Sequence, residues 1–205
     1  MHSQWAAGLL EVMPSDPDPA PRRGYHHGNL REALLDATRD LVAERGPQGF
    51  TLSEAARRAG VSPAAPYRHF KDREEVLAAL RRQGVERFGQ RLQAAAAEAA
   101  GPAEALAGMG PAYLAFAREE PGHYAAMFAF QPGSTEASPF EGMVQAIAEV
   151  LPVDGPDPRL VALQIWALSH GVAMLERVGL PPGTGAPPPE QILDAGVAAL
   201  LGQPG

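Results

Sequence analysis

The sequence predicts an all-α protein of about nine helices, arranged as an N-terminal three-helix unit and a C-terminal helical bundle. Between clusters of proline and glycine, apolar residues recur at helical spacing, and no stretch alternates apolar and polar residues as a strand does. Apolar residues make up 45% of the 205, which is enough for a packed core. We expect a disordered, proline-rich arm at residues 1–24 and domains at residues 25–85 and 86–205.

The first two helices are expected at residues 29–45 and 52–59. In the first, apolar residues share one face, and the Gly-Pro pair that follows Arg45 stops the helix. A capping box starts the second, because the Thr51 hydroxyl can accept from the Glu54 amide while the Glu54 carboxylate reaches back.

A third helix is expected after a very short turn, with Ser62 as its N-cap and Pro63 at its first position. Pro66 is unusual there. A proline at the fourth helical position removes the first intrahelical hydrogen bond and crowds the Ser62 carbonyl. We therefore expect a tight or irregular first turn, followed by regular helix from Pro66 to about Phe70.

The rest of the chain is expected to be helical as well. The fourth helix, residues 72–100, starts with Asp72 as its cap and Glu75 completing a second capping box. Residues 160–175 are apolar nearly all round but too short and interrupted to span a membrane. Such a helix needs neighbours on all sides, and one of them is expected to be a second subunit. Five further helices are expected at about residues 102–119, 122–130, 139–151, 157–178 and 188–201.

Charge is unevenly distributed along the chain. Residues 22–73 hold ten Arg and Lys against six Asp and Glu, whereas residues 74–205 hold seven against fifteen. This pattern indicates that one end attracts a polyanion, although ordinary scatter over a short stretch explains the same numbers.

Other features narrow the function classes. The chain has no cysteine, which excludes disulfides and thiol catalysis and fits a reducing compartment. We find no signal peptide and expect a cytoplasmic protein. No nucleophile elbow, phosphate loop, metal triad or paired-acid motif is present, so we expect neither an enzyme nor a cofactor or metal site.

Two helices separated by about three residues, the second of them short, match a helix-turn-helix. The short helix presents Tyr67, Arg68 and His69 within one turn, and such a turn meets base edges in the major groove of B-DNA. Phe70 is interpreted as a core aromatic residue. Basic side chains around this helix would contact phosphates and supply most of the affinity. The candidate DNA-binding residues are Thr51, Arg57, Ser62, Pro63, Ala64, Ala65, Tyr67, Arg68, His69, Lys71 and Arg73.

The segment TLSEAARRAGVSPAAPYRHFKDREEVLAAL (51–80) resembles the DNA-binding signature of the tetracycline-repressor (TetR) family of bacterial regulators. The resemblance covers about residues 25–90 and implies that residues 63–69 form the recognition helix. Two positions depart from the family pattern: Pro66 stands where leucine is usual, and Arg73 where lysine is commonest. The resemblance also implies phosphate contacts for Thr51, Tyr67, His69, Lys71 and Arg73.

The C-terminal region resembles a subgroup named for a Trp…His-Gly (WHG) motif, here Trp166, His170 and Gly171. The first two share a helix face, and the glycine allows another helix to come close. Aromatic and methionine side chains in two preceding helices either line an apolar ligand cavity or fill the core. The resemblance implies a sensor and favours the cavity. The candidate ligand-binding residues are Met109, Tyr113, Phe116, Tyr124, Met127, Phe128, Trp166 and His170.

The last two helices are the expected homodimer contact, forming a four-helix contact with their twins. A two-fold dimer binds a palindromic double-stranded DNA operator with half-sites about 34–36 Å apart, or a multiple of this. In our working hypothesis an unidentified small, apolar effector shifts the fourth helix and releases the DNA, and the resemblance implies a repressor. The candidate dimerisation residues are Leu168, Val172, Leu175, Leu193, Val197, Leu200 and Leu201.

One alternative remains besides a DNA-binding regulator. A helical protein-interaction module has the same composition, but it lacks the strongly salt-dependent affinity for DNA that a true DNA-binding protein shows.

Overall fold

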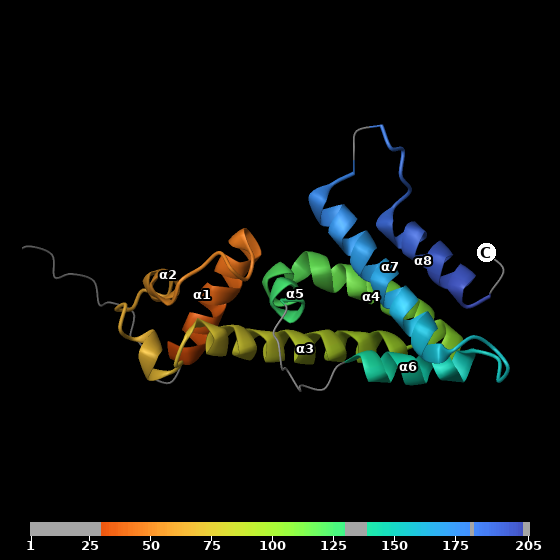
Figure 1. Cartoon of the computed structure of the whole chain (residues 1–205), viewed down its shortest axis with the longest axis horizontal. Helices are drawn as coiled ribbons and strands as arrows, with labels where there is room; N and C mark the ends of the chain where they lie inside the picture. Colours follow the sequence, from red (N-terminus) through yellow and green to blue (C-terminus); the bar gives the residue numbers. More distant parts are fainter. Residues whose placement is uncertain (1–29, 130–138, 181–182, 203–205) are drawn as a thin grey trace, which may run out of the picture.

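The computed structural model describes residues 30–129, 139–180 and 183–202, and its regular structure is all helical (Figure 1). The described residues form eight α-helices and one short 3₁₀ helix, and none of them lies in a strand. The expected all-α fold is therefore confirmed. The disordered arm expected at residues 1–24 lies outside the described residues.

Three short elements form the N-terminal head: α1 (Leu30–Arg45), α2 (Leu52–Arg58) and the 3₁₀ helix η1 (Pro66–Arg68). The capping box of α2 is confirmed. The Thr51 hydroxyl accepts from the Glu54 amide at 3.2 Å, and the Glu54 carboxylate accepts from the Thr51 amide at 2.9 Å. One core of the head contains Leu34, Leu35, Leu52, Ala56, Phe70, Val76 and Ala79.

The prediction of a regular third helix is wrong, because η1 spans three residues only and Ser62 does not cap it. Pro66 has no amide to offer the Ser62 carbonyl, which accepts from the Ala65 amide at 2.9 Å instead. The Pro66 carbonyl then accepts from the amides of His69 and Phe70, both at 2.9 Å. The chain between α2 and α3 therefore makes tight turns in place of an α-helix.

One long helix, α3 (Arg73–Ala97), belongs to both the head and the body (Figure 1). Asp72 caps it as expected, with Oδ1 accepting from the Glu75 amide at 2.9 Å. The expected second capping box is not completed, because the Glu75 carboxylate accepts from the Lys71 amide at 2.6 Å. The proposed boundary between residues 85 and 86 falls inside α3 and stays a prediction. The face of α3 that carries Leu77, Leu80, Gly84 and Phe88 is buried.

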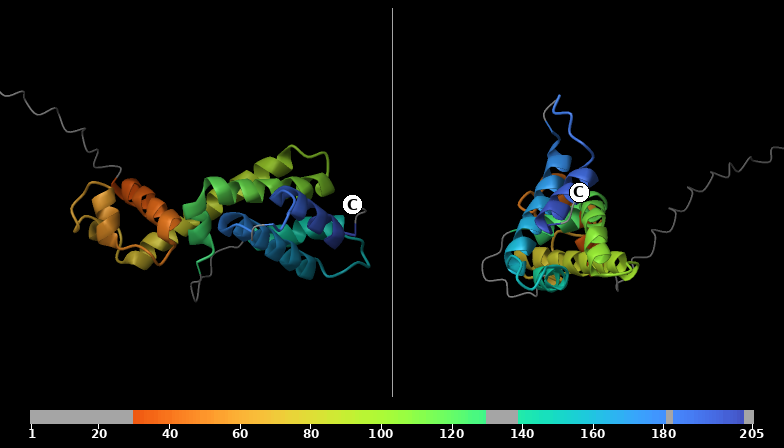
Figure 2. Two further views of the ribbon diagram at one scale, coloured as in Figure 1. Left: turned by 90° about the horizontal axis from the view of Figure 1, so that it is seen from above. Right: turned by 90° about the vertical axis from the view of Figure 1, so that its right-hand side faces the viewer.

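The body contains five further helices: α4 (Pro102–Glu119), α5 (Pro121–Met127), α6 (Pro139–Val150), α7 (Pro158–Val178) and α8 (Pro189–Leu200). Of these, α4 and α5 pack against α3, and α6, α7 and α8 pack against α4. The short helix α5 lies at the junction and contacts both α1 and α3. Figures 1 and 2 show α7 and α8 side by side, and both contact α4. Within the described ranges, none of the helices combines the length and the apolar content that a membrane crossing needs.

Candidate DNA-binding surface and effector site

The segment between α2 and α3 keeps some side chains inside and presents others to solvent. Pro66 is buried, and Phe70 is 2% exposed within the core of the head, as expected for a core aromatic residue. Between them Tyr67 is 61% exposed, and Arg68 and His69 are exposed beside it. A phenol, a guanidinium and an imidazole therefore stand together on the outside of the head, where they can reach phosphates and base edges.

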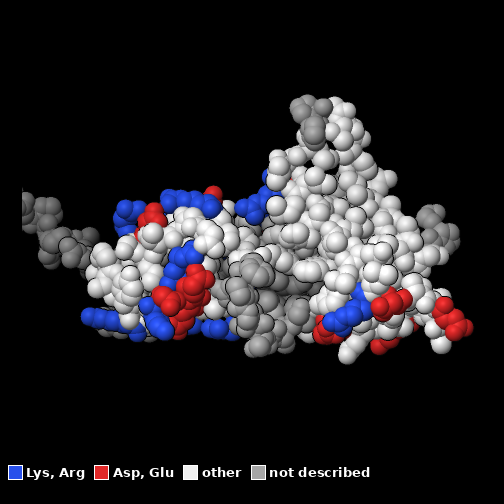
Figure 3. Space-filling view, in the orientation of Figure 1, with Lys and Arg blue, Asp and Glu red and all other residues white. Residues whose placement is uncertain are grey.

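Most of the predicted DNA contacts lie at the surface of the head. In the view of Figure 3, most of the visible Lys and Arg side chains lie over the head and its junction with the body. Ala65 and Arg73 are half-buried. The exposed members of the set are Thr51, Arg57, Ser62, Pro63, Ala64, Tyr67, Arg68, His69 and Lys71.

Arg73 also has a structural role. Its Nη1 donates to the Pro47 carbonyl at 2.8 Å, and its Nη2 donates to the Gln48 side-chain oxygen at 2.6 Å. Its guanidinium carbon lies 5.6 Å from the centre of the Phe50 ring. These contacts tie the turn between α1 and α2 to the first residue of α3, whether or not Arg73 also contacts DNA.

Five of the predicted effector residues form one group, here called the aromatic cluster: Tyr113, Tyr124, Phe128, Trp166 and His170. The centroid of the Phe128 ring lies 4.8 Å from that of Tyr124, 4.7 Å from that of His170 and 6.1 Å from that of Trp166. Tyr113 meets Tyr124 edge-on at 5.9 Å. The cluster therefore joins α4, the C-terminal end of α5 and α7.

The polar atoms of the aromatic cluster form a hydrogen-bonded relay. Burial lowers the pKa of His170, so the ring is neutral at neutral pH. The Tyr124 hydroxyl is hydrogen-bonded to Nδ1 of this ring at 2.7 Å and to the Tyr113 hydroxyl at 3.1 Å. Burial raises the pKa of both tyrosines. The cluster therefore carries no charge of its own.

The other three predicted effector residues lie outside the aromatic cluster. Phe116 is 2% exposed and packs against Phe88, with 5.2 Å between ring centroids. Met127 faces α3, where a Cβ added to Gly84 would stand 2.8 Å from its Cγ. Both border the same core as the cluster. Met109 packs against a different core.

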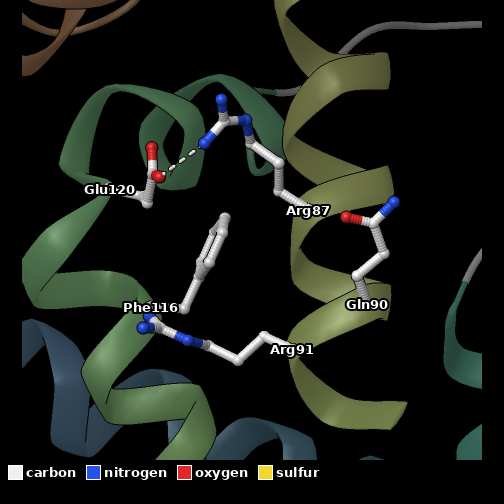
Figure 4. A pocket seen from close by; sticks show the side chains of 5 residues that line it. All are labelled: Arg87, Gln90, Arg91, Phe116 and Glu120. Atoms are coloured by element: carbon white, nitrogen blue, oxygen red, sulfur yellow. Dashed lines mark hydrogen bonds and ion pairs between the residues drawn. The ribbon is translucent and has the colours of Figure 1, made fainter. Parts of the chain in front are cut away.

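Two shallow pockets lie where the head meets the body. The first, of about 340 Å³, is open to solvent between α3 and α4, and Figure 4 shows Arg87, Gln90 and Arg91 of α3 opposite Phe116 and Glu120. Its central charges are paired, since Arg87 lies 2.8 Å from Glu120. The second, of about 420 Å³, lies between α1 and the start of α5. Neither includes the aromatic cluster, although Phe116, one of the predicted effector residues, lines the first.

The start of α5 is in direct contact with the head. A Cβ added to Gly122 would stand 2.3 Å from the Arg39 carbonyl oxygen. His123 is 2% exposed, and its Nδ1 lies 2.7 Å from the Glu120 carboxylate. Burial lowers the pKa of His123. Burial also pushes the pKa of Glu120 up, but the hydrogen bond from His123 and the charge of Arg87 outweigh it, and that pKa lies below its usual value. A neutral histidine therefore donates to a charged carboxylate at this contact.

The outer face of α7 is apolar and exposed. Figure 3 shows a broad uncharged surface over α7 and α8. A Cβ added to Gly171 would meet nothing within 4 Å, which leaves room for another helix there. The face consists of Leu160, Leu163, Ala167, Gly171, Met174, Leu175 and Val178, which recur at helical spacing.

The predicted dimer residues divide into two groups. Leu175 is 49% exposed on the outer face of α7. Leu193 and Val172 lie inside the core of their own chain, at 0% and 4% exposure, and are not available to a partner, which corrects the expectation for these two. The physical reason is that α8 turns its apolar stripe toward α4 and α7. The role of the half-buried members stays a prediction: Leu168, Val197, Leu200 and Leu201.

Sequence reasoning missed two contacts between elements, those of Gly122 and Arg81. Arg81 is 8% exposed in α3, and its guanidinium donates to the Ala129 carbonyl just beyond α5. The available signal was its position, because Arg81 interrupts the apolar stripe that runs through Leu77 and Gly84. The glycine gave no comparable signal.

Two family models match this chain, one over the head and one over the body. The model described as bacterial regulatory proteins, tetR family, matches residues 34–80. The model described as the tetracyclin repressor-like C-terminal domain matches residues 106–200.

Similar curated proteins are transcriptional regulators. The HTH-type transcriptional regulator BetI of Rhizobium meliloti is 35% identical over 79 residues, which are 38% of this chain and 39% of BetI. The chain thus spans about two fifths of the length of that relative. An uncharacterized HTH-type transcriptional regulator of Mycobacterium tuberculosis is 24% identical over 156 residues, 73% of this chain and 71% of the relative.

Solved structures share the fold over most of the chain. A protein of unknown function from Rhodococcus sp. RHA1 has a TM-score of 0.72 and 29% identity, covering 88% of this chain and 97% of its own. FadR from Bacillus subtilis, in complex with stearoyl-CoA, has a TM-score of 0.66 and 16% identity, covering 85% and 99%. The exposed segment between α2 and α3, the helical body and the two matching models agree, and the chain belongs to the tetracycline-repressor family of DNA-binding transcriptional regulators.

Proposed function

We propose that the protein is a cytoplasmic repressor that binds a palindromic operator as a homodimer and leaves it when a small, largely apolar effector binds the body. The observation that carries the DNA-binding part is the position of Tyr67, 61% exposed between two buried residues. Arg57 and Lys71 are exposed on the same head. An exposed aromatic hydroxyl flanked by cations suits contact with the phosphates and bases of a duplex.

The outer face of α7 supports the dimer. A two-fold contact is made by the same patch on both subunits, so the patch must complement itself. The small Ala167 and Gly171 lie at the middle of this face, with larger apolar side chains toward both ends. Two copies of α7 can therefore cross closely at the glycine and bury the leucines on either side.

The aromatic cluster supports control by an effector. Uncharged rings and a short relay of polar atoms, drawn from three helices, are typical of a site for a small organic molecule. α5 carries part of the cluster and contacts both α1 and α3, so a shift of α5 reaches the head. Among similar folds, AibR was solved with isovaleryl coenzyme A and operator DNA, and FadR with stearoyl-CoA.

The test is a band-shift titration of the protein against the promoter region of its own gene. We expect Tyr67→Ala and Arg57→Ala each to weaken binding by about tenfold. Arg159→Ala, which removes an exposed cation from the body, is the matched control and should leave binding unchanged. If neither head substitution changes the affinity for the promoter DNA, the proposal is contradicted.

A second titration at higher salt separates a regulator from a protein-interaction module. Affinity for the operator should fall steeply as salt rises, because phosphate contacts release counterions. An affinity that is weak and independent of salt would favour the interaction module. A reporter driven by the same promoter should be silenced by the wild-type protein but not by Tyr67→Ala, and activation instead would overturn the repressor assignment.

A further inference from the structure

Arg81 carries a positive charge into the interior between α3 and α5. Its exposed fraction is 8%, and Leu77 and Gly84 on the same face of α3 are buried as well. Moving a guanidinium out of water costs several kcal/mol unless hydrogen bonds and an opposite charge replace its hydration. Its partners therefore decide what this residue does.

The described residues supply only part of the hydrogen bonds and no opposite charge for the Arg81 guanidinium. Nη2 donates to the Ala129 carbonyl, beyond the C-terminal end of α5. Nε is buried and has no acceptor, and none of the carboxylates that the structure describes pairs with Arg81. A guanidinium is a planar fork that binds a carboxylate through two parallel hydrogen bonds. Arg81 thus keeps both a charge and a donor for a partner that the described chain does not supply.

Arg81 contacts the residue that follows Phe128 of the aromatic cluster in the chain. Ala129, which Arg81 contacts, follows Phe128, and the Phe128 ring lies within 6.1 Å of both His170 and Trp166, centroid to centroid. α3 and α5 are closely packed at this point, as the approach of Met127 to Gly84 shows. The Arg81 guanidinium is therefore held at the residue next to an uncharged set of rings.

We propose that Arg81 anchors the carboxylate of the effector, while the aromatic cluster takes its apolar part, so that the effector is a hydrophobic organic acid. This inference rests on the proposed function and names the chemical class of its ligand. A single interior cation matches a single carboxylate, whereas a coenzyme A thioester has lost its carboxylate and carries several phosphates instead. The carboxylate supplies the acceptor for Nε and the counter-charge that the site needs.

The same contact links binding to the head. A carboxylate on Arg81 competes with the Ala129 carbonyl and loosens the C-terminal end of α5 from α3. The other end of α5 lies against α1 at Gly122 and Arg39, with no room for a Cβ. A displacement of α5 therefore changes the position of the head.

The experiment uses Trp166 as the reporter in a Trp5→Phe protein, where it is the remaining tryptophan. Its fluorescence is titrated with straight-chain fatty acids from hexanoate to myristate, with the alcohols of the same lengths, and with decanoyl-CoA. We expect the acids to bind at least about tenfold more tightly than the alcohols. Arg81→Met should reduce the affinity for acids to that for alcohols and leave the alcohols unaffected. Arg82→Met, which removes an adjacent exposed charge, should keep the preference.

Three results would overturn the inference: equal affinity for acids and alcohols, a preference that survives Arg81→Met, or fluorescence that responds to none of the acids. Binding of decanoyl-CoA without binding of decanoate would also overturn it. Operator binding without ligand is measured in parallel. If the protein binds its operator but shows no preference for acids, the role of Arg81 is refuted and the proposed function stands. If the protein does not bind its operator, the proposed function is refuted.

A second measurement keeps the inference testable if Arg81→Met does not fold. In protein labelled with ¹⁵N-arginine, the Arg81 Nε–H signal is assigned by its loss in Arg81→Lys. We expect decanoate to shift this signal downfield and decanol to leave it in place. An Nε–H signal that does not shift when decanoate is added would contradict the proposed contact between Arg81 and the carboxylate.

Discussion

His170 couples the aromatic cluster to pH. Burial lowers the pKa of its ring in the folded protein. Below about pH 6.5, the ordinary pKa of histidine, the ring therefore binds a proton in the unfolded chain more readily than in the folded protein. Protonation then favours unfolding. The stability contributed by the neutral ring is complete above that pH and is lost as the pH falls below it.

We therefore predict that His170→Asn makes the free energy of unfolding less dependent on pH below neutral pH. Asparagine offers an oxygen to the Tyr124 hydroxyl but does not titrate. Between about pH 7 and pH 5, the free energy of unfolding should fall less steeply in the variant, by at most about 1.4 kcal/mol per pH unit and by less because the ring is partly exposed. Urea unfolding at several pH values measures this, and equal slopes in the two proteins would refute it.

Single residues also show where sequence reasoning reached its limit. The sequence predicts Tyr67 at the surface and Phe70 in the core, and the structure places both as expected. Arg81 was missed because a charge within an apolar stripe is usually read as a solvated position at its edge. Only the packing of α5 on α3 shows that this one is buried.

At the scale of elements, the position of α5 depends on the close approach of Gly122 to α1. We predict that Gly122→Ala destabilises the protein by about 1–3 kcal/mol, because its Cβ would overlap the Arg39 carbonyl and push the two helices apart. Operator binding should weaken as well, since α1 belongs to the head. Urea unfolding and band shifts report the two effects.

Gly89→Ala is the matched control for this prediction. Gly89 lies within α3, and a Cβ there would meet nothing within 4 Å. Alanine should therefore stabilise the helix by up to about 1 kcal/mol through its higher helix propensity. If both substitutions had the same effect, the contact between α5 and α1 would not be close in solution.

Most elements were predictable because their ends carry local chemistry. Thr51 and Asp72 cap α2 and α3 through bonds that the sequence spacing alone indicates. The exception lies between them. Pro66 predicts an irregular turn at the start of a helix, whereas the structure has no α-helix there. Without the Pro66 amide, too few residues remain before Phe70 to propagate one.

At the scale of the whole molecule, an apolar stripe does not say what covers it. The stripe of α8 and the outer face of α7 look alike in sequence, yet Leu193 is buried within its own chain and Leu163 is 44% exposed. The difference arises from how α8 packs against α4, a contact between residues far apart in the chain. The exposed apolar face of α7 therefore follows from the fold, whereas the presence of two apolar helices can be predicted from the sequence.

The exposed face of α7 gives the last prediction. If two copies meet there, Leu163→Glu together with Met174→Glu places like charges opposite each other across the two-fold axis and leaves them without water, which costs more than the contact contributes. We expect a folded monomer by sedimentation velocity at concentrations where the wild type is dimeric. Binding to a palindromic operator should weaken strongly, because one head then binds one half-site alone. Val153→Glu changes an equally apolar and fully exposed residue outside this face, and it should leave both the mass and the operator affinity as they are. A dimer that tolerates both glutamates would place the subunit contact elsewhere on the body.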